Sequence, residues 1–304
     1  MEPQLPVAGS AALVVNTASR RGRDAFEPAC RAMLERGIDL GAAYPVRKPK
    51  QMLRVVEREI HQGRPLVIVG GGDGTVTMVS RAFLRGQSVM GLLPLGTGNS
   101  FAQGVGIPLD LAGAVRTLVE GKVADVDLGI VNGRTFANFT TVGLSAVVAR
   151  ETKPLLKRLF GPVAYVLTGI FLAGRHRAFD CRIDADDGVH RFRTHQLVIA
   201  NGRIFGATPI HPGAKVDDGL LTVFAVPGAN RRQIQRTWTA LLAGRQTDLE
   251  DALFISSKHL MLETKPRRAI DMDGEIVTRT PATFSVARNG LRIVVPQSFV
   301  GSPP

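Results

Sequence analysis

The sequence predicts an α/β fold in two parts, a doubly wound parallel sheet followed by a mainly antiparallel β domain. Three observations support this prediction. Short, fully apolar runs alternate with helical segments in the first part of the chain, and glycine-rich loops follow two of these runs. From about residue 126 the pattern changes to strands and turns with few helices. Repeated strand, loop and helix units indicate a parallel sheet covered on both faces.

The first part of the chain provides three strands and three helices. We expect strands at 11–15, 65–69 and 89–93, and helices at 25–36, 52–61 and 76–84. The run at 65–69 is apolar at every position, which is typical of a strand that is buried on both faces. In the second helix Leu53, Val56 and Ile60 recur at helical intervals.

The second part of the chain is richer in strands. We expect strands at 129–132, 136–141, 181–183, 196–200, 220–224, 282–286 and 291–295, and helices around 154–173 and 231–242. The change of pattern places the domain boundary near residues 125–130. We therefore expect a first domain at 1–127, rejoined by 288–304, and a β-rich second domain at 128–287.

Composition excludes several classes of protein. A hydrophobic share of 44% and a charged share of 21% exclude an intrinsically disordered chain. The two cysteines, Cys30 and Cys181, are too few for a disulfide scaffold. The net charge of +12 favours polyanionic partners, but the basic residues are scattered and aromatics make up only 6%, so nucleic acid is not expected. The N-terminus has no secretory signal pattern, and we expect a cytoplasmic protein.

One apolar stretch, residues 159–174, is bracketed by basic residues. These are Lys157, Arg158, Arg175 and Arg177. The stretch is shorter than the roughly 20 residues that a membrane-spanning helix needs. Two alternatives stay open: a helix of the protein core, or a segment that lies against an anionic membrane surface.

The strongest local motif is a glycine-rich loop between a buried strand and a helix. It reads Gly70, Gly71, Gly72, Asp73, Gly74 and Thr75. Free backbone amides at such a turn and helix N-terminus favour a phosphate group. An acidic residue inside an anion site suggests a bound cation, so Asp73 suggests Mg²⁺ held with phosphates. The alternative is an ordinary turn in which Asp73 caps the helix.

A second glycine-rich loop follows the next buried strand, over residues 94–101. Its core is Gly96, Thr97, Gly98 and Asn99. In a doubly wound sheet the carboxyl ends of neighbouring strands line one crevice, so both loops can face one ligand. Neither loop matches the Walker pattern of P-loop proteins.

These two loops together resemble the diacylglycerol and sphingosine lipid kinase family, especially its small soluble bacterial members. The resemblance continues through most of the chain, at residues 125–129, 138–143, 201–202, 212–221 and 273–275. The first glycine loop alone is shared with NAD kinases and phosphofructokinases, whereas the ordered set of motifs is far more specific.

The resemblance implies an ATP-dependent lipid kinase with Mg²⁺ as cofactor and a lipid as acceptor. It implies a nucleotide site made of Asn16, Gly71, Gly72, Asp73, Gly74, Thr75, Gly96, Thr97, Gly98 and Asn99. It also implies a Mg²⁺–water network at Asp73 and Asp127. A separate metal turn would use the main-chain oxygens of Lys215 and Leu220 and the carboxylate of Asp218.

The acceptor base is the remaining role in such a phosphoryl transfer. The resemblance places it in the pair Asp273 and Glu275, with Asp73 completing the catalytic set. From the residues alone, alternation in a strand would put Asp271 and Asp273 on one face, and Gly274 could then turn the chain. A plain polar hairpin and, for residues 217–219, an ordinary turn are the alternatives.

Three positions differ from the family pattern: Ser100 stands where an aspartate is usual, Thr17 for a proline and Thr77 for an asparagine. Residues 44–48 also lack an expected threonine. These differences keep two other functions open: a water-soluble kinase of the NAD-kinase type, and a catalytically silent lipid or nucleotide sensor. The sequence does not fix the lipid or the oligomeric state, a homodimer being one option.

Overall fold

A computed structural model of the chain describes most of its residues. The described ranges are 11–84, 86–144, 146–147, 177–202, 204–205, 208–211, 213–228, 230–243, 245–272 and 275–302. The chain divides into two compact units. The first comprises Met1–Leu128, Lys215–Asp218 and Ala287–Pro304, and the second comprises Gly129–Ala214 and Gly219–Val286.

The sheet of the first unit is parallel. Its strands are β1 (Ala11–Asn16), β2 (Leu40–Val46), β3 (Leu66–Gly71) and β4 (Val89–Pro94), in the spatial order β2-β1-β3-β4. All three pairings between them are parallel. Strands β3 and β4 are buried at every residue, as their apolar sequences predict. Beyond β4, strand β17 (Ala282–Val295) continues the sheet in parallel, with Ile293 opposite Met90.

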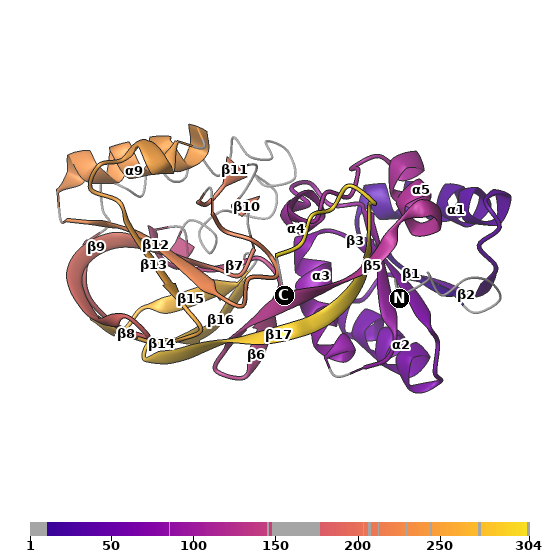
Figure 1. Cartoon of the computed structure of the whole chain (residues 1–304), viewed down its shortest axis with the longest axis horizontal. Coiled ribbons are helices and arrows are strands. Elements are labelled where there is room, and N and C mark those ends of the chain that lie inside the picture. Colours follow the sequence, from indigo (N-terminus) through magenta and orange to yellow (C-terminus); the bar gives the residue numbers. More distant parts are fainter. Residues whose placement is uncertain are drawn as a thin grey trace. The chain divides into compact units, whose positions relative to one another are not determined.

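Helices cover both faces of this sheet, which confirms the predicted doubly wound arrangement. Helix α1 (Arg20–Glu35) packs against α5 (Leu111–Glu120), and α2 (Pro49–His61) packs against α3 (Asp73–Phe83). The two pairs lie on opposite sides of the strands (Figure 1). Helix α1 begins earlier than predicted because the Ser19 hydroxyl accepts a hydrogen bond from the Gly22 amide and caps the helix.

Sequence patterns missed three elements of the first unit: strand β2, helix α5 and the short helix α4 (Ser100–Gly104). In β2 the burial alternates between half-buried and exposed, because the strand lies at the edge of the sheet. Its weak apolar pattern therefore gave no strand signal.

The second unit is mainly antiparallel, as predicted. Its described strands are β6 (Arg134–Phe136), β7 (Phe139–Gly143), β8 (Phe179–Ala185), β9 (Gly188–Ala200), β10 (Ile204–Phe205), β11 (Thr208–Pro209), β12 (Leu221–Pro227), β13 (Leu253–Ser257), β14 (His259–Lys265), β15 (Ala269–Met272) and β16 (Glu275–Arg279). The long strand β9 organises them, because it pairs with β7, β8 and β12. Helix α9 (Arg231–Ala243) and the short 3₁₀ helix η1 (Gln246–Asp248) follow β12.

The core of the second unit has two layers, one on each face of the strands around β9. Leu197 and Ile199 point into the larger cluster, which includes Phe136, Phe179 and Phe284. The alternate residues of β9 point into a smaller cluster with Ile210 and Phe224. Strand β12 is buried on both faces for this reason.

Other sequence predictions agree with the structure only in part or concern residues that it does not describe. The strands expected at 282–286 and 291–295 form one strand, β17, and the one expected at 136–141 is split between β6 and β7. The helix expected at 154–173, and with it the apolar stretch 159–174 and most of its basic flanks, lies outside the described residues. Strand β5 (Lys122–Val131) begins earlier than its prediction at 129–132. In the part of the chain that the structure describes, no helix is long and apolar enough to cross a membrane.

Candidate functional site

The strand order of the first unit marks where a ligand can bind. Strand β1 is followed along the chain by β2 on one side, whereas β3 is followed by β4 on the other side. Ligands of open α/β sheets bind beyond the carboxyl ends of the two strands where the order reverses, which here are β1 and β3. Asn16 ends β1 and Gly71 ends β3, and the Asn16 amide donates to the Thr75 hydroxyl at 3.1 Å.

The first glycine loop joins β3 to helix α3 with backbone groups alone. Gly72 occupies the N-cap position, and no side chain caps this helix. Its carbonyl accepts from the amides of Thr75 and Val76, at 2.9 and 3.1 Å. A methyl group on Gly74 would meet no atom within 4 Å, and this glycine is exposed. The start of α3 therefore presents a bare backbone to open space, which suits a phosphate.

The second glycine loop is braced from inside by Asn99. The side-chain oxygen of Asn99 accepts from the Gly96 amide at 2.8 Å, and its side-chain nitrogen donates to the carbonyls of Pro94 and Gly96. Asn99 has the left-handed backbone conformation (φ 52°) and is 5% exposed. Asparagine tolerates this conformation better than most residues. These contacts thus shape the loop, while Thr97 and Gly98 are exposed.

The two glycine loops pack backbone to backbone. The Leu95 amide donates to the Gly71 carbonyl at 2.9 Å. A methyl group on Gly72 would lie 2.9 Å from the Gly96 Cα atom, and one on Gly96 would lie 2.5 Å from the Gly72 Cα atom. Real Cβ atoms do not approach other atoms so closely, so both positions need glycine for packing.

Asp73 connects the loops electrostatically. Its Oδ2 accepts from the Ser100 amide at 3.1 Å, and its Oδ1 accepts from the Phe101 amide at 3.0 Å. The carboxylate of the first loop therefore sits on the N-terminus of helix α4, in the second loop. Unpaired amides of a helix start stabilise a negative charge. The alternative considered from sequence, a cap of its own helix, is wrong, because Asp73 caps the neighbouring helix.

Arg21 is a residue of this edge that the sequence analysis did not single out. From the first turn of α1, its guanidinium donates to the Gly96 carbonyl at 2.7 Å. The contact joins the start of α1 to the second glycine loop, across 75 residues of sequence. A basic residue in the loop after the first strand was the available signal. Its partner could not be foreseen, since only the folded sheet brings the two loops together.

Asp127, expected in the acidic network, is 2% exposed on β5. Its Oδ1 accepts from the Asn289 amide at 2.8 Å, and its own amide donates to the Val216 carbonyl. These contacts give Asp127 a structural role within the first unit. Within the described residues, no group of three or more His, Cys, Asp or Glu side chains has the arrangement of a metal site.

The expected metal turn has internal contacts of its own. The Lys215 amide donates to Asp218 Oδ2 at 3.1 Å. Beside it, the Asp217 carboxylate accepts from the amide and hydroxyl of Ser302, at 2.7 and 2.8 Å, and so holds the C-terminal segment. Leu220, the third expected ligand, is assigned to the second unit. The role of this turn in metal binding stays a prediction.

The expected acceptor base belongs to the second unit. Strands β15 and β16 pair with Met272 opposite Glu275, and Glu275 is exposed. Asp271 is buried on β15, opposite Thr141 of β7. Asp273 lies outside the described residues.

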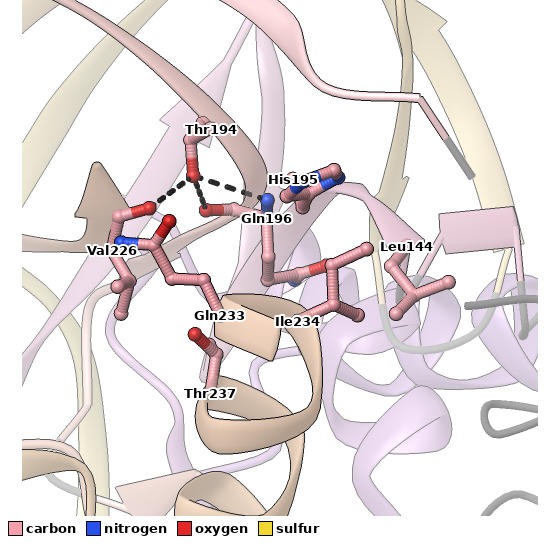
Figure 2. A pocket seen from close by; sticks show the side chains of 8 residues that line it. All are labelled: Leu144, Thr194, His195, Gln196, Val226, Gln233, Ile234 and Thr237. Atoms are coloured by element: carbon pink, nitrogen blue, oxygen red, sulfur yellow. Dashed lines mark hydrogen bonds between the residues drawn. The ribbon is translucent and has the colours of Figure 1, made fainter. Parts of the chain in front are cut away.

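A small cavity with a mostly apolar lining lies beneath helix α9 in the second unit. Figure 2 shows Gln233, Ile234 and Thr237 of the helix facing Thr194 and His195 of β9, and the Thr194 hydroxyl is 2.8 Å from the Val226 carbonyl that accepts its hydrogen bond. The cavity has a volume of about 10 Å³, which is room for roughly one water molecule. It cannot take an acyl chain in this conformation.

Comparisons with known proteins agree with this architecture. The model of the diacylglycerol kinase catalytic domain matches residues 10–131, and that of the YegS C-terminal NAD kinase beta sandwich-like domain matches residues 138–295. A "Probable lipid kinase YegS-like" of Pseudomonas aeruginosa is 33% identical over 296 residues, covering 96% of this chain and 95% of the relative. A diacylglycerol kinase of Staphylococcus epidermidis is 28% identical over 284 residues, covering 91% and 89%.

Solved structures show the same fold. A diacylglycerol kinase from Bacillus anthracis str. Sterne superposes with a TM-score of 0.72 at 20% identity, and another structure from that organism reaches 0.81 at 24% identity. Each covers 96% of this chain and 98% of the solved chain. The fold is thus an N-terminal α/β parallel-sheet domain with a β-sandwich-like C-terminal domain, and the chain belongs to the family of lipid kinases that carry the diacylglycerol kinase catalytic domain and the YegS-like C-terminal domain.

Proposed function

We propose that this protein transfers the γ-phosphate of ATP to a hydroxyl group of a membrane lipid of the diacylglycerol or sphingoid type. The observation that carries the proposal is the edge formed by the two glycine loops. Asp73 lies at their junction, and Gly74 faces open space at the start of α3. Phosphoryl transfer needs mainly positioning and charge neutralisation, which such an edge supplies.

The nucleotide phosphates would lie against the bare start of α3. The packing of Gly72 on Gly96 fixes the two loops relative to each other. Asn16 and Thr75 hold the loop after β1 beside them, and Asn99 keeps the second loop in shape. The guanidinium of Arg21 adds positive charge at the same edge. These contacts preorganise the site, so that little rearrangement is needed when the nucleotide binds.

The chemistry of Asp73 fits a phosphate-bound Mg²⁺ ion. A carboxylate has about four acceptor positions, two on each oxygen. The amides of Ser100 and Phe101 take one position on each. Besides capping α4, the Asp73 carboxylate would attract a Mg²⁺ ion held with the phosphates. When bound, Mg²⁺ would neutralise charge on the β- and γ-phosphates. We include Asp127 in this network on family resemblance, and likewise Lys215, Asp218 and Leu220 in a separate metal turn.

The acceptor hydroxyl would give its proton to the pair Asp273 and Glu275. Glu275 is exposed at the start of β16, so its carboxylate is accessible to solvent and to a substrate. We accordingly assign residues 1–127 and 288–304 to nucleotide binding, and residues 128–287 to the lipid. Because ATP is the donor and the acceptor stays in a bilayer, we place the protein at the cytoplasmic face of a membrane, attached peripherally.

A transfer assay tests this proposal. γ-³²P-ATP and Mg²⁺ are incubated with the protein and a panel of lipids in mixed micelles: diacylglycerol, ceramide, sphingosine and phosphatidylglycerol. The control protein is Asp73→Asn, which keeps the size of the side chain. We expect one lipid class to be labelled by the parent and at least about a hundredfold more slowly by the control.

Two outcomes would overturn the proposal. Labelling of NAD in a parallel reaction, with no lipid labelled, would assign the protein to the NAD-kinase type of chemistry. Binding of ATP with no transfer to any acceptor would support a nucleotide sensor, a reading that Ser100 in place of the usual aspartate favours.

A further inference from the structure

Helix α9 presents one continuous face to solvent in the second unit. The exposed residues of this face, called the α9 face below, are Arg232, Gln235, Arg236, Thr239 and Ala243. They recur at helical intervals, and Ile234 and Thr237 on the opposite side are buried. Figure 1 shows α9 in orange on the outer side of the strands β9 and β12. The face is therefore open to a partner.

The charge of the α9 face is of one sign. The helix contains Arg231, Arg232 and Arg236 and no acidic residue. No carboxylate in the described part of the chain lies within ion-pair distance of Arg232 or Arg236. The neighbouring carboxylates have other contacts: Asp248 pairs with Arg245, and Asp251 accepts from the Gln233 side chain.

The position of these arginines opposes helix stability. The N-terminal end of a helix carries partial positive charge, so acidic residues stabilise it and basic residues destabilise it. Helix α9 has two arginines in its first turn and no basic residue in its last turn. Residues that destabilise the helix in which they lie are expected mainly at functional positions. This placement, together with the exposure, indicates that the arginines serve a partner.

A groove adjoins the α9 face at its C-terminal half. It has a volume of about 300 Å³ and is lined by Arg236, Thr239, Ala240, Ala243, Arg245, Asp248 and Leu249. Its lining combines the apolar side chains of Ala240, Ala243 and Leu249 with the exposed Arg236 and Arg245. Arg245 is paired with Asp248 at 2.8 Å, whereas no ion pair joins Arg236 to a carboxylate of the described residues. Apolar side chains beside exposed cations match the headgroup region of an anionic membrane.

We propose that the α9 face docks the protein on an anionic lipid bilayer, with Arg232 and Arg236 against the headgroups. This inference rests on the proposed function, because a kinase whose acceptor stays in the bilayer must reach it from the aqueous side. The long arginine side chains can lie along the membrane surface while their guanidinium groups contact phosphates. The residues of this face differ from Lys157, Arg158, Arg175 and Arg177, which the sequence suggested for the same task.

Vesicle sedimentation tests the proposal on the full chain. The vesicles contain phosphatidylcholine with about one-third phosphatidylglycerol, or phosphatidylcholine alone, at two salt concentrations. The variant is Arg232→Gln/Arg236→Gln. Each basic residue at an anionic surface contributes on the order of 1 kcal/mol, about fivefold in affinity, so both together should weaken binding about 25-fold at low salt. The loss should shrink at high salt, because screening weakens the parent's binding too.

The matched control is Arg134→Gln/Arg191→Gln. Both residues are exposed in the second unit, on β6 and β9, and the control removes the same charge as the variant. It should pellet with anionic vesicles like the parent. Equal losses in both double variants would mean that only net charge matters, and would overturn the proposal. So would parental binding by Arg232→Gln/Arg236→Gln.

A second variant separates docking from folding. Arg232→Glu places an acidic residue in the first turn of α9, where its negative charge interacts favourably with the helix dipole. We expect the melting temperature to stay level or rise while binding to anionic vesicles falls. If the variant melts at a lower temperature and also binds vesicles more weakly, Arg232 has a structural role, which would contradict the proposal.

Failure of this proposal can be told apart from failure of the proposed function. The sedimentation assay contains no ATP and no acceptor lipid, so its result does not depend on phosphoryl transfer. Unchanged vesicle binding in the variants would refute the docking role of the α9 face. The kinase assignment would be unaffected, because the transfer assay tests it independently. Release of the parent from vesicles by inorganic polyphosphate, with no preference for anionic over neutral lipid, would indicate a soluble polyanion as partner and refute the bilayer.

Discussion

Asp73 and Glu59 are both carboxylates of the first unit that accept several hydrogen bonds, but their donors differ in kind. Glu59 of α2 is 0% exposed, and it accepts from the side chains of Tyr44, Arg58 and Arg64 at 2.9 to 3.4 Å. Asp73 is half-buried just after a strand end, and the backbone amides of Ser100 and Phe101 donate to it.

The comparison shows how one functional group serves two purposes. The donors around Glu59 are two cations and a phenol, which neutralise it and enclose it. Burial by itself would raise the pKa of Glu59, but the hydrogen bonds from Tyr44, Arg64 and Arg58 outweigh it and hold the pKa below its ordinary value. The amides of Ser100 and Phe101 fix the orientation of the Asp73 carboxylate. A carboxylate oriented in this way beside open backbone is suited to a cation and phosphates.

The largest effect is expected at Asp73. We expect Asp73→Asn to lower the transfer rate by about 100- to 1000-fold, because charge stabilisation is lost. The melting temperature should fall by only a few degrees, since an asparagine retains one acceptor for the cap of α4. Steady-state kinetics with a thermal melt measures both. Near-parental turnover with a normal Mg²⁺ requirement would contradict the assignment.

At Glu59 the loss should appear in stability. Glu59→Gln removes the counter-charge of the partly exposed Arg58 and Arg64, and we expect the free energy of unfolding to fall by about 1–3 kcal/mol. Nucleotide affinity of the folded fraction should stay at the parental value. Denaturant unfolding at pH 7, with ATP titration below the transition, checks this. If stability is unchanged and ATP binding is lost, the roles of the two carboxylates are reversed from those stated above.

The pH dependence of stability sharpens the same contrast. A carboxyl group whose pKa is lower in the folded state contributes stability above its unfolded pKa, about 4.3 for glutamate, and loses it as pH falls through the folded value. The parent should therefore lose this contribution below about pH 4.3. The Glu59→Gln variant should show a flatter stability profile there. Parallel profiles for the two proteins would be inconsistent with the lowered pKa.

Two neighbouring glycines should respond with opposite signs. Gly72→Ala places a methyl group 2.9 Å from the Gly96 Cα atom, so we expect a destabilisation of about 1–3 kcal/mol. Gly74→Ala meets open space, and it should leave stability unchanged or raise it by up to about 1 kcal/mol. ATP affinity should nevertheless fall in Gly74→Ala, by about tenfold, because the methyl group would occupy the phosphate position. Thermal melts measure the changes in stability, and calorimetric titration measures the ATP affinity. Parental ATP affinity in Gly74→Ala would show that this glycine does not lie at the phosphate position.

The smallest effect is expected at Ser100. Ser100→Asp places a second carboxylate beside Asp73, and like charges destabilise a buried site unless a cation is present. We expect a lower melting temperature without Mg²⁺, a larger Mg²⁺-dependent rise than in the parent, and a several-fold lower Mg²⁺ requirement for transfer. A variant that melts like the parent at every Mg²⁺ concentration would show that position 100 does not face the ion.

Much of the fold could be predicted because buried strands have apolar sequences. Strands β1, β3 and β4 are apolar at nearly every position, and their pattern predicted them. The edge strand β2 alternates weakly, and the five-residue helix α4 is too short for any periodicity. These elements form because neighbours hold them: β2 pairs with β1, and Asp73 caps α4.

The candidate site was likewise predicted only in part. The sequence predicted both glycine loops and their acidic residue, since close backbone approach demands glycine and a phosphate site demands bare amides. It did not predict the partner of Asp73, the internal role of Asn99 or the contact of Arg21. The contacts of Asp73 and Arg21 join segments that follow different strands, and those of Asn99 depend on the folded shape of its own loop, so no local pattern encodes them.

The sequence by itself determined the fold class, the family and the loops where a nucleotide would bind, because these depend on residue type and local spacing. Only the tertiary structure decided what each polar residue contacts. The order β2-β1-β3-β4 brings the ends of β1, β3 and β4 together, and this sets Asp73 on α4 and Gly72 against Gly96. Hydrogen bonds form only over about 3 Å, so whether a carboxylate is neutralised or left available depends on chain segments distant in sequence.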